Sequence, residues 1–258
     1  MDIFNAIILG IIQGLTEFLP ISSSGHLVIF QKLLGFQQQQ LIFDCALHIG
    51  TLLAVFMYFS KDIKRLFDSV VHYREANSEF LLLKDIITGS IPTAIIGLLF
   101  KDYFERVFDS ALIAGIMLCV TGIFVGATKF IPEGSKKRVG LINSILIGIA
   151  QGIAIIPGIS RSGATITCAL MCKIDREVAF RFSFLLSIPA ILGAFALEAI
   201  EIEQINNIIP LILGTISSAI VGLLALRFLN GLIKKGHLYY FSPYCLAVGI
   251  GTVIYCLL

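Results

Sequence analysis

Two long apolar regions of this chain are each interrupted near the middle by polar residues, glycine and proline. The first covers residues 3–34 and contains EFLPISSSGH, and the second covers residues 141–172 and contains IIPGISRSGAT. Each half is shorter than the roughly 20 residues that a helix needs to cross a bilayer. Backbone that leaves the helix at membrane depth is tolerated only where protein or a water-filled cavity surrounds it. We therefore predict that both regions are re-entrant helix–loop–helix pairs.

The rest of the sequence contains apolar stretches that are long enough to span a membrane. With 57% hydrophobic and only 14% charged residues, the chain is predicted to be an all-α integral membrane protein. No polar segment is long enough to fold separately, so residues 1–258 are expected to form a single polytopic membrane domain. The start lacks the features of a cleaved signal peptide, so we expect the first apolar region to be retained. The six predicted spans cover residues 41–59, 84–100, 111–130, 178–198, 207–229 and 241–257.

The charge argues against a nucleic-acid-binding protein, and the cysteine pattern argues against a metal site built from cysteines. The net charge is +2, and the positive residues lie in short connecting loops, so no basic face is available for nucleic acid. The six cysteines mostly lie inside apolar stretches, without a CxxC pair or a histidine at metal-ligand spacing. We interpret them as small buried hydrophobic side chains.

The two interrupted regions resemble each other. Residues 9–26 align without a gap on residues 147–164, and the matched pairs include Gly10 with Gly148 and Gln13 with Gln151. Such self-similarity indicates an internal duplication.

If each pair returns to the face it entered, the connections near residues 60–83, 131–177 and 230–240 share one face, which carries most of the Lys and Arg residues. The positive-inside rule makes that face cytoplasmic. The first pair then enters from outside and the second from inside, as an inverted-topology repeat whose loops meet near the midplane.

Three Gly-xxx-Gly spacings let helix backbones approach one another closely. They are Gly10/Gly14, Gly122/Gly126 and Gly148/Gly152. Packing within the chain is the favoured interpretation, and a homodimer is the alternative.

The polar residues of the two interruptions form the candidate site. Charged groups at bilayer depth cost several kcal/mol and usually face an interior cavity with a function. The guanidinium of Arg161 suits phosphate or carboxylate, and the glycine- and serine-rich loops favour an anion at the following helix N-termini, so phosphate is the expected ligand. A purely structural pair of Arg161 with Glu17 remains the alternative. The candidate residues are Glu17, Ser22, Ser23, Ser24 and His26 from the first interruption and Ser160, Arg161, Ser162, Gly163 and Thr165 from the second.

Residues of the first interruption have several possible chemical roles. Gln13 and Glu17 are four residues apart and share a helix face, so they could hold Mg²⁺ or Ca²⁺ if substrate phosphates complete the coordination. The serine run could instead cap a helix. His26 lies three residues after Ser23 and could act as its base, attack phosphorus itself or serve as a general acid. The sequence leaves these choices open.

Two further segments place polar residues in predicted spans. FDCALHIGTLLAV contains Asp44 one turn before His48, and we interpret that pair as structural packing. AFRFSFLLSIPA contains Arg181 and Ser183, which are expected to face the interior, with Arg181 able to extend to the cytoplasmic edge.

The segments QGLTEFLPISSSGHL and PGISRSGAT resemble the two signature blocks of the undecaprenyl-diphosphatases, also called the bacitracin resistance protein family. The resemblance implies removal of the terminal phosphate from undecaprenyl diphosphate, a lipid of the bacterial plasma membrane, at a site that opens to the extracytoplasmic side. It further implies a divalent cation and a role in recycling the lipid carrier for cell-wall synthesis and in bacitracin resistance.

By position, the resemblance assigns the metal to Gln13 and Glu17 and the phosphates to Arg161 with neighbouring hydroxyls. It makes Ser23 and His26 the candidates for nucleophile and acid or base. The first acidic position of the family is Gln13 in this chain, which leaves more of the metal charge to Glu17.

A polyprenyl-phosphate transporter is the main alternative, because inverted repeats with broken helices are common in transporters. The two interruptions differ in a way that favours an enzyme. Glu17, Ser23 and His26 align with Ile155, Arg161 and Ala164, so the halves are specialised.

Overall fold

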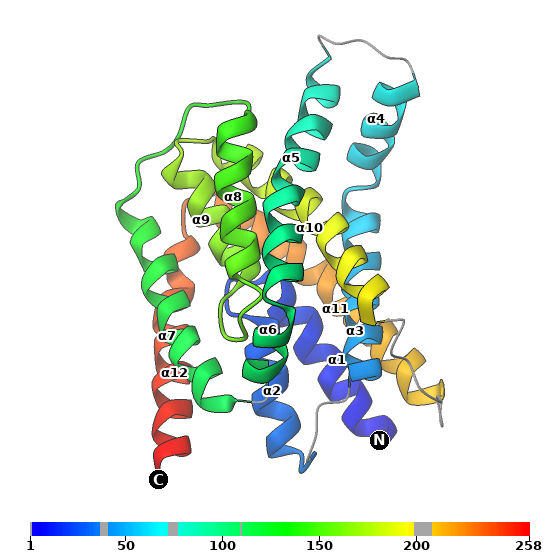
Figure 1. Ribbon diagram of the computed structural model, residues 1–258, viewed down its shortest axis with the longest axis vertical. Helices are drawn as coiled ribbons and strands as arrows, with labels where there is room; N and C mark the ends of the chain where they lie inside the picture. The colour runs from blue at the N-terminus through cyan, green and yellow to red at the C-terminus, as the bar shows by residue number, and fades with distance from the viewer. Residues whose placement is uncertain (1, 37–40, 72–76, 109, 199–207) are drawn as a thin grey trace.

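The computed structural model describes residues 2–36, 41–71, 77–108, 110–198 and 208–258. Within these ranges the chain is helical, apart from turns and one isolated bridge between Lys136 and Ile174. The predicted all-α architecture is therefore confirmed (Figure 1).

Both interrupted regions fold as helix–break–helix pairs. The first consists of α1 (Ile3–Phe18) and α2 (Ser23–Leu33), and the second of α8 (Leu141–Ile153) and α9 (Arg161–Met171). These helices contain 16, 11, 13 and 11 residues, so each is too short to cross a bilayer alone. The predicted re-entrant pairs are confirmed.

Among the described residues, six further elements are long and apolar enough to span a membrane, if α3 is counted together with the helix that follows it. The axis bends by 74° between α3 (Leu41–Tyr58) and α4 (Ser60–Val71). The other spans are α5 (Ser78–Leu99), α7 (Ala111–Gly126) with η1 (Ala127–Phe130), α10 (Arg176–Glu198), α11 (Ile208–Lys234), and η3 (Leu238–Phe241) with α12 (Ser242–Leu257). The chain is a multi-pass membrane protein. Residue 207 of the predicted fifth span, and residues 72–76 of the 60–83 connection, lie outside the described residues.

The two pairs enter the bundle from opposite ends. In Figure 1, α1 rises from the lower end near the N-terminus, whereas α8 descends from the upper end. The packing partners follow the same symmetry, since α1 lies against α11 of the second half and α8 lies against α5 of the first half. The predicted inverted-topology repeat is confirmed.

Glycine allows these helices to approach closely. A Cβ on Gly10 would meet the backbone of Gly214 in α11, and a Cβ on Gly148 would meet the carbonyl of Gly89 in α5. A Cβ on Gly122 would meet the side chain of Leu246 in α12. The glycines of the Gly-xxx-Gly spacings thus pack against other helices of the same chain, which confirms the favoured interpretation.

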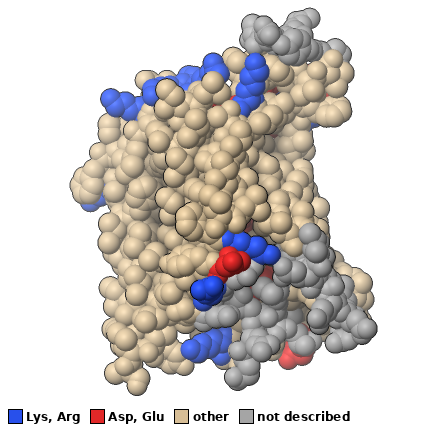
Figure 2. All heavy atoms as spheres, in the orientation of Figure 1, with Lys and Arg blue, Asp and Glu red and all other residues tan. Residues whose placement is uncertain are grey.

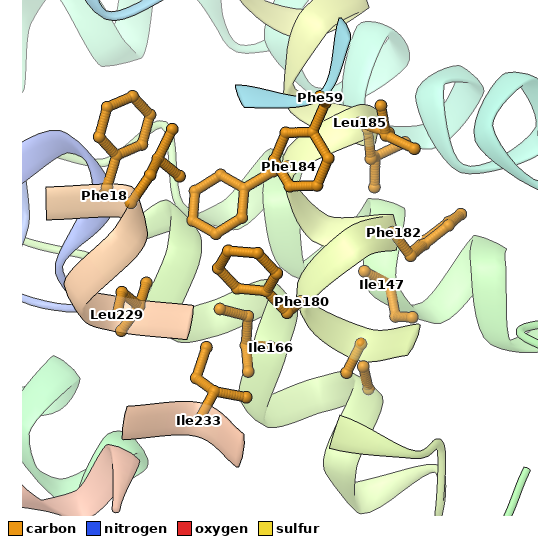
Figure 3. Packing of buried hydrophobic residues seen from close by; sticks show 14 of the residues in the cluster. Phe18, Phe59, Ile147, Ile166, Phe180, Phe182, Phe184, Leu185, Leu229 and Ile233 are labelled. Carbon is orange, nitrogen blue, oxygen red and sulfur yellow. The ribbon is translucent and has the colours of Figure 1, made fainter. Parts of the chain in front are cut away.

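A cluster of aromatic and aliphatic side chains fills the bundle beside the two breaks (Figure 3). Phe18 at the end of α1 meets Phe184 of α10 edge to face, with ring centroids 5.6 Å apart. Ile166 of α9 and Leu229 of α11 are fully buried in the same cluster. Close packing of this kind fixes the ends of the broken helices, so the polar residues that follow them have defined positions.

The outer surface is mostly apolar. Large side chains such as Ile91 and Leu98 of α5 and Ile220 of α11 are more than half exposed. An apolar surface of this extent suits contact with lipid. Figure 2 shows Lys and Arg along the upper edge, a second small group of charges lower on this face and a broad uncharged surface between them.

Candidate active site

The first break ends α1 and begins α2 with a serine in an unusual conformation. The backbone of Ser22 has φ +67°, a conformation that residues other than glycine rarely adopt. Its Oγ accepts hydrogen bonds from the backbone N–H of Gly25, at 3.3 Å, and from that of Gly158 in the second break, at 3.1 Å. One hydroxyl therefore caps α2 and joins the two loops.

The second break is held by α7. Thr121 donates to the carbonyl of Gly158 at 2.8 Å and accepts from the N–H of Ser160 at 3.0 Å. Gly158 has φ +95°, and a Cβ there would overlap the carbonyl of Ala114, so only glycine fits. Ser160 then caps α9 by accepting from the N–H of Gly163 at 3.1 Å.

Glu17 and Arg161 meet between the two breaks. Arg161 Nη2 lies 2.5 Å from Glu17 Oε1, although 144 residues separate them in sequence. The other carboxylate oxygen, Oε2, accepts from Ser23 Oγ at 2.6 Å and from Gln13 Nε2 at 3.1 Å. The side chains of Glu17 and Arg161 are only 6% and 15% exposed. The two loops thus place a carboxylate, a guanidinium and a serine hydroxyl in direct contact.

Two buried polar atoms at this contact have no hydrogen-bond partner among the described residues. They are Nη1 of Arg161, a donor, and Oε1 of Gln13, an acceptor. Leaving such groups unpaired costs about 1–3 kcal/mol each, so they are usually explained by a ligand or water. A donor for an anion and an acceptor for a cation therefore lie beside Glu17.

His26 is buried, and its ring nitrogens contact Ser22 and Tyr244. Its Nδ1 lies 2.7 Å from the carbonyl oxygen of Ser22, and its Nε2 lies 2.8 Å from the hydroxyl of Tyr244 in α12. The rings of His26 and Tyr244 are nearly parallel, with centroids 5.7 Å apart. Both ring nitrogens are engaged, so the arrangement with His26 as the base of Ser23 is not formed, and Glu17 occupies that position instead.

The remaining hydroxyls of the candidate site mostly bond to protein. Ser24 Oγ lies 3.3 Å from Ser22 Oγ, and Ser162 Oγ lies 3.2 Å from Ser160 Oγ. Thr165 donates to the carbonyl of Arg161 at 2.8 Å, and its hydroxyl lies 2.5 Å from that of Ser183 in α10. These contacts fix the first turns of α2 and α9.

His48 of α3 also reaches the site. Its Nε2 lies 3.7 Å from Glu17 Oε2, and its Nδ1 lies 2.8 Å from the backbone carbonyl of Asp44. The sequence alone favours packing of His48 with Asp44 and does not reveal the proximity of His48 to Glu17. A polar residue in an apolar span was the only signal, and it does not reveal which way the side chain faces.

Arg181 lies outside this site. It pairs with Glu79 of α5 at 2.6 Å and with Asp62 of α4 at 2.7 Å. Arg181 therefore connects α10 to α4 and α5 near the face whose positive residues predict it to be cytoplasmic.

Comparisons with known proteins relate the chain to one family. Residues 6–251 match the family described as Bacitracin resistance protein BacA. An undecaprenyl-diphosphatase of Desulforapulum autotrophicum is 43% identical over 271 residues, which cover 98% of both proteins. One of Treponema denticola is 44% identical over 268 residues, covering 99% of this chain and 98% of the relative. One of Korarchaeum cryptofilum is 42% identical over 266 residues, covering 98% and 99%.

Proposed function

We propose that this chain, which belongs to the family of the bacitracin resistance protein BacA and is an undecaprenyl-diphosphatase, cleaves its substrate where its two broken helices meet. The contact between Glu17 and Arg161 carries this proposal. It joins oppositely charged groups from two repeats beside a buried donor and a buried acceptor that have no partner among the described residues.

The diphosphate head binds at the first turns of α2 and α9. Arg161 Nη1 supplies a free donor in a buried position. The N-termini of both helices lie in the two breaks, where backbone N–H groups favour phosphate oxygens. Ser22, Ser24, Ser160, Ser162, Gly163 and Thr165 shape this anion site, and the apolar outer surface of the bundle accommodates the prenyl chain.

Ser23 is the nucleophile that the contacts favour. Its hydroxyl donates to Glu17 Oε2 at 2.6 Å, so the carboxylate can take the proton as Oγ attacks the terminal phosphorus. The bond from phosphorus to the bridging oxygen breaks, and its electron pair leaves with undecaprenyl phosphate. Water then cleaves the phosphoserine, releases inorganic phosphate and restores the serine hydroxyl. Arg161 stabilises the charge on the phosphoryl oxygens.

His26 lies on the same helix as the proposed nucleophile and supports its position. One turn of α2 separates it from Ser23, and its contacts to Ser22 and Tyr244 hold the start of that helix. Because Nδ1 donates to the Ser22 carbonyl, Nε2 of the neutral ring accepts from the Tyr244 hydroxyl. His26 would donate a proton to the leaving oxygen only as the imidazolium, with the substrate in place of the Tyr244 hydroxyl.

The donor set fits a weakly held Mg²⁺ or Ca²⁺. Glu17 offers a carboxylate, and Gln13 offers a buried amide oxygen that has no partner among the described residues. Hard cations of this kind prefer such oxygen ligands and often complete their coordination with substrate phosphates. When bound, the cation would neutralise charge on the phosphoryl oxygens.

The protein acts in the bacterial plasma membrane, with its site open to the extracytoplasmic side. The positive residues at the end of the bundle that contains Lys136, Lys137 and Arg138 support this orientation. There the product is recycled as a lipid carrier for cell-wall synthesis, and the activity confers resistance to bacitracin. A homodimer stays a prediction, because the Gly-xxx-Gly spacings are used inside the chain. The relatives described above are named for the phosphatase activity, and none for transport.

The direct test is phosphate release from undecaprenyl diphosphate by the purified protein in detergent with Mg²⁺. We expect release by the wild type and a loss of roughly 100-fold or more for Arg161→Ala and Glu17→Ala. Unchanged thermal unfolding of the variants serves as the control for folding. Full activity in either variant would remove the proposed site.

A further inference from the structure

The hydrogen bond of His48 to Asp44 fixes which ring nitrogen carries a proton. Nδ1 lies 2.8 Å from the Asp44 carbonyl oxygen, which can only accept. The proton of the neutral imidazole therefore sits on Nδ1. The other nitrogen, Nε2, then carries a lone pair, and it faces the Glu17 carboxylate at 3.7 Å.

A lone pair on Nε2 and a carboxylate oxygen at this distance repel each other, and a cation bound by both atoms would remove that repulsion. The separation is too long for a direct hydrogen bond. A third electron-rich atom, Gln13 Oε1, lies buried without a partner among the described residues, one turn before Glu17 on the same helix. Oxygen donors from Gln13 and Glu17 and a nitrogen donor from His48 thus come from two helices, α1 and α3.

We propose that His48 Nε2 is a third protein ligand of the divalent cation, beside Glu17 and Gln13. Donor atoms about 2.0–2.2 Å from one ion lie roughly 3–4 Å apart, which agrees with the 3.7 Å between Nε2 and Oε2. A backbone carbonyl that orients a ligating histidine, as that of Asp44 does, is a usual support of metal sites. This inference rests on the proposed function only for the role of the ion in catalysis.

The mixed ligand set indicates the class of cation. Imidazole nitrogen favours first-row transition ions, whereas Ca²⁺ and Mg²⁺ prefer oxygen. His48 therefore shifts the preference of the site toward ions such as Mn²⁺, which accept both donors. The side chain of His48 is 33% exposed, so an ion can enter and keep coordination positions for water or substrate phosphates. Arg161 binds the opposite oxygen of Glu17, and the phosphates offset the combined positive charge.

Mn²⁺ binding to the purified full-length protein, measured by electron paramagnetic resonance without substrate, tests this assignment. We expect bound Mn²⁺ with magnetic coupling to a nitrogen nucleus in the wild type. His48→Gln keeps an amide oxygen at this position, so the nitrogen coupling should disappear and the affinity for Mn²⁺ should fall at least about tenfold relative to that for Mg²⁺. His237→Gln is the matched control, because His237 stacks on Tyr240 away from the site. That variant should bind Mn²⁺ as the wild type does.

Three outcomes would overturn the assignment. They are no Mn²⁺ bound to the wild type, nitrogen coupling that persists in His48→Gln, and a Mn²⁺ affinity that does not change in this variant. The last is expected if a protonated His48 pairs directly with Glu17. Phosphate release from the same preparations separates this inference from the proposed function. If the wild type hydrolyses undecaprenyl diphosphate but binds Mn²⁺ independently of His48, only the ligand assignment fails.

Discussion

At the scale of single residues, the three consecutive serines after the first break differ in what their hydroxyls contact. Ser22 accepts from backbone N–H groups of both loops, Ser23 donates to Glu17, and Ser24 lies beside Ser22. The sequence shows three equivalent hydroxyls and does not reveal which of them contacts the carboxylate.

We predict that Ser23→Ala lowers kcat for undecaprenyl diphosphate by about a thousandfold or more, since both the nucleophile and its bond to Glu17 are lost. Ser90→Ala in α5 is the matched control and should stay within about tenfold of the wild type, since its hydroxyl donates to the carbonyl of Ile86 in the same helix. Steady-state phosphate release measures both. Comparable losses in the two variants would argue against Ser23 as the nucleophile.

The residues that sequence reasoning found and missed differ in the kind of signal they carry. Glu17 and Arg161 could be identified because a charge at bilayer depth is costly in any packing arrangement. Tyr244 lies 218 residues from its partner His26, and no local pattern connects them. The orientation of His48 toward Glu17 likewise depends on how α3 rotates against α1, which the sequence of α3 does not reveal.

At the scale of helices, backbone contact at glycine holds the broken helices against their neighbours. The short arms α1 and α8 cannot span the membrane alone, so their position depends on α11 and α5. Any side chain added at these contacts should therefore shift a loop of the site.

We predict that Gly148→Ala lowers the free energy of unfolding by roughly 1–3 kcal/mol, because its Cβ would overlap the carbonyl of Gly89. Gly193→Ala in α10 is the control, because open space surrounds that position and alanine favours a helix by about 0.5–1 kcal/mol. Unfolding monitored by circular dichroism in detergent compares the two. Equal stability of both variants would contradict the close approach of α8 and α5.

The start of α10 provides a pH-dependent contact outside the membrane. Asp175 Oδ1 accepts from the N–H of Glu177 at 3.1 Å, and Oδ2 accepts from Lys137 Nζ at 2.6 Å. The hydrogen bond from Lys137 lowers the pKa of Asp175 below its ordinary value. A carboxylate with a lowered folded-state pKa contributes stability above its unfolded pKa, and this stability is lost as the pH falls through the folded-state pKa.

We predict that Asp175→Asn reduces the difference in thermal stability between about pH 7 and about pH 3, because asparagine still caps the helix but does not titrate. Asp175→Ala should also lose the cap, at about 1 kcal/mol. Melting curves at the two pH values measure both effects. An unchanged pH dependence in Asp175→Asn would show that other groups govern it.

Hydropathy predicted the spans and the broken helices, but not the helices in the connections. α4 lies within the 60–83 connection, and α6 (Lys101–Phe108) lies between two spans. Such polar-rich segments become helical when one face packs on the bundle, as the pair of Arg181 with Asp62 illustrates for α4. That packing depends on partners far away in sequence.

At the scale of the whole molecule, the inverted repeat brings two dissimilar loops to one place. Duplication supplies two re-entrant pairs of opposite orientation, and their divergence gives one loop the carboxylate and the other the guanidinium. The repeat and the opposite entry of its two re-entrant pairs could be predicted from the constant offset and the distribution of positive charge. The direct contact between Glu17 and Arg161 required the structure, since it depends on how deeply each pair enters the bundle.

Both termini lie at the same end of the bundle, opposite the loop between η1 and α8 (Figure 1). We predict that an epitope tag after Leu258 is labelled by antibody in intact spheroplasts, whereas a tag inserted after Lys137 is labelled only after the membrane is permeabilised. Retained phosphatase activity of the tagged proteins is the control. The reverse pattern would contradict the proposed orientation.

The central claim is that Glu17 and Arg161, from different repeats, act as one catalytic unit. A double-mutant cycle on kcat/KM for phosphate release from undecaprenyl diphosphate, with Glu17→Gln and Arg161→Lys, tests it most directly. The account predicts a loss of roughly 100-fold or more for each single variant, and a double variant within about tenfold of the less active single one. A double variant whose loss equals the product of the two single losses would show that the residues act independently, and would contradict the account.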